Sequence, residues 1–157
     1  MIPERLRVCF HQYAYEGFPR LPHQTKKPSF LHAIVTGRNT AETNRGYLEE
    51  LLHRCVAQGC GSVLIEEHLE GQRLRPHQIF EIASEMTLKA RGKVRVLAFV
   101  DLNADNRGNT KFGEDVAVNR GLNVSVFRTA AAAEAWLLPQ LEGTINGIPT
   151  PIAPGNS

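Results

Sequence analysis

Residues 93–102, KVRVLAFVDL, most limit the folds open to this chain. The run is apolar at nearly every position, and a polar loop follows it. Segments with helical periodicity flank it on both sides. Such a run is typical of a strand that is buried on both faces of a sheet. We therefore predict that it is the central strand of an α/β sheet.

Two strands are predicted before the first long helix. Residues 5–15 alternate partly between apolar and polar side chains, and Phe30–Thr36 is a second run that ends at Gly37. The proline-rich segment 16–29 between them is predicted to be a loop. The two strands can pair in antiparallel fashion, although this loop is longer than a tight hairpin needs.

The rest of the chain alternates helices and strands. Thr40 is a suitable N-cap for a helix that ends at Gly59, and its predicted buried stripe consists of Leu48, Leu51, Leu52, Cys55 and Val56. A short strand, Ser62–Glu66, and a loop over 67–75 come next. Pro76 suits the first turn of a second helix, which ends at Gly92 and whose apolar positions are Ile79, Phe80, Ala83, Met86 and Ala90.

Three further elements follow the central strand. We predict a short helix over Phe112–Arg120, an edge strand over Leu122–Arg128 and a final helix capped by Thr129. The predicted order is β-β-α-β-α-β-α-β-α, in a mixed but mostly parallel sheet with helices packed on it. It forms one α/β domain over residues 1–138, with an extended or disordered tail over 139–157.

Composition excludes several classes of function. The net charge is +2, with basic and acidic residues interspersed, so there is no clustered basic face for nucleic acid. No apolar run approaches 18 residues, which predicts no membrane span. The N-terminus lacks an apolar signal core, and Cys9, Cys55 and Cys60 lack metal-finger spacing. We expect a cytoplasmic protein with reduced cysteines.

Two clusters of polar residues are candidate ligand sites. Glu66 and His68 lie at the carboxyl end of a predicted strand, where ligands gather in open α/β sheets, although a solvated charged loop is the simpler interpretation. Asp101-x-Asn103-x-Asp105 resembles the start of a calcium loop, but the glycine and glutamate expected later in such a loop are missing. Capping of the next helix and of loop backbone is the preferred interpretation. The six histidines show no zinc spacing, and no nucleotide-binding or hydrolase motif is present. We predict no metal site, no cofactor and no catalytic residue.

Four stretches together resemble the STAS domain, named for sulfate transporters and anti-sigma factor antagonists: IVTGRNT, LAFVD, FGEDVAVNRGLNVSVF and TAAAAEAWL. The chain looks in particular like the stand-alone bacterial members of poorly defined role. The family's best-known mechanism is the phosphorylation of a serine or threonine after the third strand, which breaks a protein interface. The matching residues here, 66–83, contain no serine, threonine or tyrosine. The resemblance therefore implies the architecture of that switch without its chemistry.

Three classes of function remain open. The resemblance favours a non-enzymatic, regulatory module that binds another protein through Gly71, Gln72, Arg73, Arg75 and Gln78. The alternative is a module that binds a small molecule or a lipid in a pocket between the sheet and the helices, with the segment 16–29 as a lid. An enzyme would require Glu66, His68 or Asp101 to titrate abnormally in a shared pocket.

Overall fold

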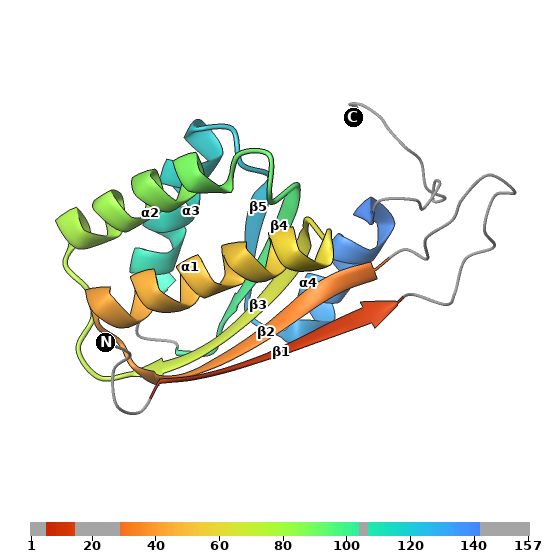
Figure 1. Ribbon diagram of the computed structural model, residues 1–157. Coiled ribbons are helices and arrows are strands. Elements are labelled where there is room, and N and C mark those ends of the chain that lie inside the picture. Colours follow the sequence, from red (N-terminus) through yellow and green to blue (C-terminus); the bar gives the residue numbers. More distant parts are fainter. Residues whose placement is uncertain (1–5, 15–28, 104–106, 142–157) are drawn as a thin grey trace, which may run out of the picture.

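The computed structural model describes residues 6–14, 29–103 and 107–141 and shows an α/β fold (Figure 1). Five strands form one sheet in the order β1-β2-β3-β4-β5. The strands are β1 (Arg7–Ala14), β2 (Ser29–Arg38), β3 (Ser62–Glu70), β4 (Val96–Asp101) and β5 (Val124–Phe127). The helices are α1 (Ala41–Gln58), α2 (Pro76–Ala90), α3 (Arg107–Asn119) and α4 (Ala130–Leu137), and a 3₁₀ turn follows over Leu138–Gln140. This order matches the one predicted from the sequence.

The connections between strands place three helices on one face of the sheet. β1 pairs with β2 in antiparallel fashion, and β2 to β5 are parallel to one another. Each β-α-β connection steps one strand in the same direction, so a constant right-handed crossover puts α1, α2 and α3 on the same side. α4 follows the last strand and packs on the opposite side, against β3 and β4 (Figure 1).

The apolar run that the sequence singled out forms β4, which is buried but is not the central strand. Val96, Ala98 and Val100 are fully buried against α4 and β3. β4 is fourth in the order, and β3 occupies the middle of the sheet. The sequence could not reveal this because both strands are apolar runs, and position in a sheet depends on which neighbours pair with each.

β3 is longer than predicted, and this correction matters for the site. The strand continues through Glu70, so the residues 67–70 predicted to be loop are part of the sheet. β2 also continues past Thr36 to Arg38 and pairs with this extension. The reason is that Leu69 prolongs the alternation of buried residues, which outweighs the charges around it.

The helix caps follow the predictions closely. Thr40 Oγ1 accepts a hydrogen bond from the amide of Thr43 at the start of α1, and Gly59 ends that helix with φ of 61°. Thr129 Oγ1 caps α4 in the same way, accepting from the amide of Ala132. α3 instead begins at Arg107, five residues before the predicted start at Phe112.

Two predicted core residues are in fact exposed. Val56 is 60% exposed, and Phe80 also lies on the surface. The guanidinium of Arg120 lies over the ring of Phe80, with its Cζ 5.2 Å from the ring centroid. This distance is within the limit of about 6 Å for a cation–π contact. Leu52 and Met86, which were predicted at apolar positions, are buried in the α1–α2 interface together with Ile82.

The remaining terminal predictions have mixed outcomes. β5 is an edge strand as predicted, and Leu137 of α4 is fully buried. The predicted tail over 139–157 is wrong at its start, because Pro139 lies in the 3₁₀ turn and Leu141 is buried. Residues 142–157 and the predicted loop up to residue 28 lie outside the described residues.

Candidate functional site

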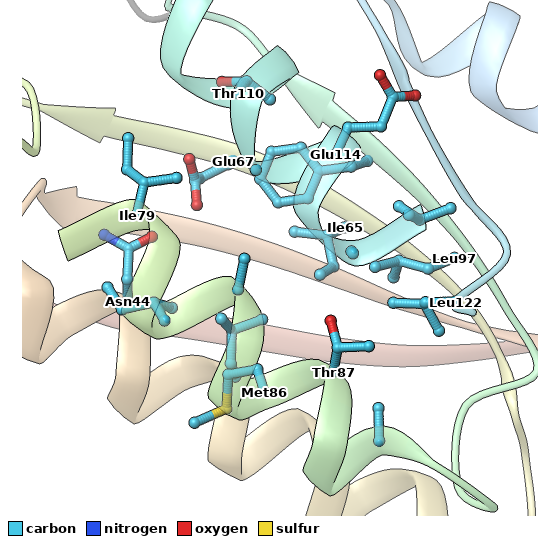
Figure 2. Close-up of a pocket in the computed structure, with 18 of the residues that line it drawn as sticks. Asn44, Ile65, Glu67, Ile79, Met86, Thr87, Leu97, Thr110, Glu114 and Leu122 are labelled. Carbon is cyan, nitrogen blue, oxygen red and sulfur yellow. The ribbon is translucent and has the colours of Figure 1, made fainter. Parts of the chain in front are cut away.

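A cavity of about 180 Å³ lies between the sheet and the layer formed by α1, α2 and α3. Its wall is mainly apolar, and Figure 2 shows side chains from the sheet and from the helices turned toward the same space. The apolar lining includes Tyr47, Leu48, Leu51, Leu52, Ile65, Leu74, Ile79, Ile82, Ala83, Met86, Leu97, Phe99, Ala117, Leu122, Val124 and Val126. Protein interiors rarely leave a space so much larger than a water molecule.

The sheet contributes one face of three neighbouring strands to this cavity. Ile65 and Glu67 of β3 alternate with residues that face α4, and Leu97 and Phe99 of β4 do the same. Leu97 and Phe99 are only partly buried, although β4 has a strand on each side. Incomplete burial in the interior of a sheet marks the place where the covering helices stand away from it.

Helix α2 forms the roof of the cavity. Its main contacts are with α1 and α3 rather than with the strands beneath it. Ile79, Ile82, Ala83 and Met86 face the cavity from this helix. Layers are usually closed by side chains that interdigitate with the sheet. Here the two neighbouring helices hold the roof, and the space below it remains open.

Glu67 is a buried carboxyl group in the cavity wall. Its side chain is 4% exposed, and its Oε2 accepts a hydrogen bond of 2.5 Å from the hydroxyl of Tyr47. Burial raises the pKa of Glu67 to about 8, the hydrogen bond from Tyr47 opposes this rise, and the charge of Asp101 adds to it. The pKa of Tyr47 is raised as well, first by burial and then by Glu67. The pair therefore holds its protons at neutral pH.

Asp101 lies directly across from Glu67 in the parallel register of β3 and β4. Its Oδ1 accepts from the backbone amide of Asn103 at 2.9 Å, and its Oδ2 accepts from the hydroxyl of Thr110 at 2.5 Å. The first bond agrees with the prediction that Asp101 binds loop backbone, whereas the second is to a side chain within α3 and does not cap the first turn of that helix. Asp105, the third position of the calcium-like pattern, lies outside the described residues. Two acidic residues thus lie next to each other on adjacent strands, Asp101 at the end of β4 and Glu67 within β3.

The polar part of the lining contains acidic and neutral groups. Glu67 and Glu114 are its charged members, and the neutral ones are Asn39, Asn44, Thr87, Asn109 and Thr110. Glu114 accepts from the amide of Val126 and forms an ion pair with the exposed Lys111. No lysine, arginine or histidine is among the described residues that line the cavity. Its electrostatic field is therefore unfavourable for an anion.

Two of the ligand candidates from the sequence lie on the opposite face of the sheet. Glu66 Oε1 lies 3.0 Å from Nε2 of His32, and Glu66 Oε2 lies 3.3 Å from Nε2 of His68. His32 is partly buried at this contact. Because neighbouring residues of a strand point to opposite faces, Glu66 and His68 do not share a site with Asp101. The shared pocket that an enzyme was expected to need is therefore not formed by these three residues.

The predicted partner-binding residues form an exposed turn between β3 and α2. Gly71, Gln72, Arg73 and Arg75 are exposed, and Gly71 has a φ of 107° that favours glycine. Gln78 is partly buried because its side chain turns back and accepts a hydrogen bond from the amide of Arg75 at 2.9 Å. The turn is next to Leu74, which lines the cavity.

Sequence reasoning missed Glu67, which is the most informative residue of the site. The signal was present, since Val63, Ile65, Glu67 and Leu69 alternate on one face of the strand. Because the predicted strand ended at Glu66, Glu67 was assigned to a loop and not to the core. A single acidic residue inside an apolar alternation would have pointed to a buried carboxyl group.

Comparisons with known proteins identify no relative. No protein-family model matches the chain, no curated protein matches it, and no solved structure matches it. Within residues 6–14, 29–103 and 107–141, no three His, Cys, Asp or Glu side chains are grouped so that they could hold a metal ion. In the same ranges no helix has the length and apolar character that crossing a membrane requires.

Proposed function

We propose that this protein is a non-enzymatic module that binds a small, mainly apolar molecule in the cavity between the sheet and helices α1, α2 and α3. The observation that carries the proposal is the cavity itself, with its volume of about 180 Å³ and its apolar wall. An engineered cavity of about 150 Å³ with a similar wall stays dry and binds benzene. A ligand the size of one six-membered ring with a short arm therefore suits this space.

The energetics of the cavity also favour an occupant. The cavity is partly open to solvent, so water can reach its apolar wall. Removal of apolar surface from water is favourable by roughly 25 cal/mol for each Å². An apolar molecule bound against this wall would therefore stabilise the folded state.

Benzene is a suitable first probe of this proposal. We expect saturating benzene to raise the melting temperature of the wild-type protein, because a ligand that binds only the folded state stabilises it. Ala83→Leu places three more carbon atoms at the cavity wall and should abolish the rise. Ala57→Leu, at an exposed position of α1, is the matched control and should keep it. The proposal fails if benzene leaves the wild type unchanged, or if it stabilises all three proteins equally.

A second candidate function is the capture of another protein by the turn from Gly71 to Gln78. The observation in its favour is that this turn is exposed yet held in place, by the backbone conformation of Gly71 and by the cap between Arg75 and Gln78. The resemblance of the sequence to STAS domains supports the same location. Arg73 and Arg75 would supply the charges that orient a partner.

A charge reversal tests this second candidate. The double variant Arg73→Glu and Arg75→Glu should lose a protein that the wild type retains in a pull-down, while the melting temperature changes little because both side chains are exposed. Glu42→Lys, an exposed charge reversal at the start of α1, is a control of similar chemistry. Retention of the same protein by the double variant would exclude this face.

A further inference from the structure

We propose that the ligand of the cavity is a small apolar amine, whose ammonium group binds at Glu67 while its apolar part fills the space beneath α2. This inference rests on the proposed function, since it assigns a chemical class to the same ligand. Three features of the described residues support it: the place of Glu67 in the wall, the second acidic group beside it, and the signs of the charges in the lining.

The first feature is the position of the Glu67 carboxyl group. Glu67 reaches the cavity from the middle strand of the sheet, and Figure 2 shows it near Ile79 and Thr110. Only its Oε2 is used by the hydroxyl of Tyr47. A carboxyl group offers about four acceptor positions, so it can bind a further donor from the cavity side. Tyr47, which also lines the cavity, fixes the group through Oε2 and leaves Oε1 for the ligand.

The second feature is Asp101, which follows the same face of the sheet one strand away. Its oxygens accept from Asn103 and Thr110, which holds an acidic group in the interior next to Glu67. Two neighbouring carboxyl groups make the local potential negative and favour a cation between or beside them. Without a ligand, Glu67 avoids two adjacent charges by keeping its proton. An ammonium group can replace that proton without changing the net charge of the buried cluster.

The third feature is the rest of the lining. Its charged members are acidic, and its neutral polar members are asparagine and threonine side chains. A carboxylate or phosphate ligand would have to leave water and face Glu67, with Asp101 next to it on β4, without a lysine, arginine or histidine among the described lining residues. A neutral ligand could enter but would gain no ion pair. We therefore expect the cavity to bind an amine most tightly, an alcohol less tightly and an acid most weakly.

Three probes with the same phenyl ring test this ranking: benzylamine, benzyl alcohol and benzoate. Isothermal titration at pH 7.5 should show that the wild-type protein binds benzylamine about tenfold more tightly than benzyl alcohol, as a buried charge-assisted hydrogen bond warrants. Benzoate should bind more weakly than either. These measurements need no variant, so they decide the matter even if a substitution impairs folding.

Two isosteric variants then locate the selectivity. Glu67→Gln should bind benzylamine and benzyl alcohol with similar affinity, because it removes the acidic partner and keeps the shape. Glu66→Gln changes the neighbouring residue on the opposite face of β3 and should keep the wild-type preference. The inference is overturned if the wild type prefers benzyl alcohol or benzoate, or if Glu67→Gln retains the preference for benzylamine. Benzene binding without any preference for the amine would leave the proposed function intact and refute this inference alone.

Discussion

The buried Glu67 makes the stability of this protein depend on pH in an unusual direction. Its pKa rises from 4.5 in the unfolded chain to about 8 in the folded protein, mainly through burial. Between these values the folded state binds one more proton than the unfolded state, so the free energy of unfolding falls as the pH rises. The contribution is fully favourable below pH 4.5 and is lost as the pH passes through 8.

The size of this effect follows from the two pKa values. Each pKa unit corresponds to about 1.4 kcal/mol, so the interval from 4.5 to about 8 corresponds to a loss on the order of 5 kcal/mol. Most of this loss falls below pH 7, and the curve levels off above pH 8. Glu67→Gln has no titrating group at this site. It should therefore gain stability relative to the wild type as the pH rises.

Urea denaturation at pH 5, 6, 7, 8 and 9 measures this difference. Subtracting the wild-type free energy of unfolding from that of Glu67→Gln cancels the contributions of the other titrating groups. Glu66→Gln, whose carboxyl group lies on the other face with His32, is the control and should not reproduce the curve. A difference that stays flat from pH 5 to 8, or that changes in the opposite direction, would show that Glu67 is not held as described.

Four further substitutions have defined outcomes. Tyr47→Phe removes the hydrogen bond that lowers the pKa of Glu67, so the titration of that carboxyl group, followed by carbon-13 NMR, should move upward. Gly113→Ala should stabilise the protein by about 1–2 kcal/mol in urea denaturation, because alanine favours the helix and its methyl group would contact α2 at the cavity wall. Gly46→Ala, which has nothing within 4 Å, should gain only the helical part, about 1 kcal/mol. Thr40→Ala should cost about 1 kcal/mol of unfolding free energy by removing the N-cap of α1.

The features that the sequence predicted well depend on local chemistry. Thr40, Gly59 and Thr129 lie at helix ends because a side-chain acceptor or a left-handed backbone is needed there, whatever surrounds the helix. The order of strands and helices followed from the same local signals. Val56 and Phe80 were wrongly predicted to be buried, because an apolar residue at the edge of a helical stripe is buried only if another element packs against it.

A pocket between the sheet and the helices was one of the predicted alternatives, but the size and the lining of the cavity could not have been predicted from the sequence. Its volume is what remains after side chains from three helices and three strands have met, and no single segment carries that information. The acidic residues of the site were easier to predict. Asp101 was among the candidates, and extending β3 by the alternation up to Leu69 would have placed Glu67 beside it. The fold depends mainly on local pattern, whereas the site depends on the fit between elements.

The support of α2 by its neighbouring helices has a consequence for motion. A helix whose main contacts are with α1 and α3 can move outward without breaking a hydrogen bond of the β-ladder. If α2 also unwinds, this opening breaks contacts between helices and the hydrogen bonds within α2, and such local opening takes less free energy than the global transition. Amide hydrogens of α2 should therefore exchange with solvent before those of β3 and β4. The sheet would remain a fixed floor while the cavity exchanges its contents.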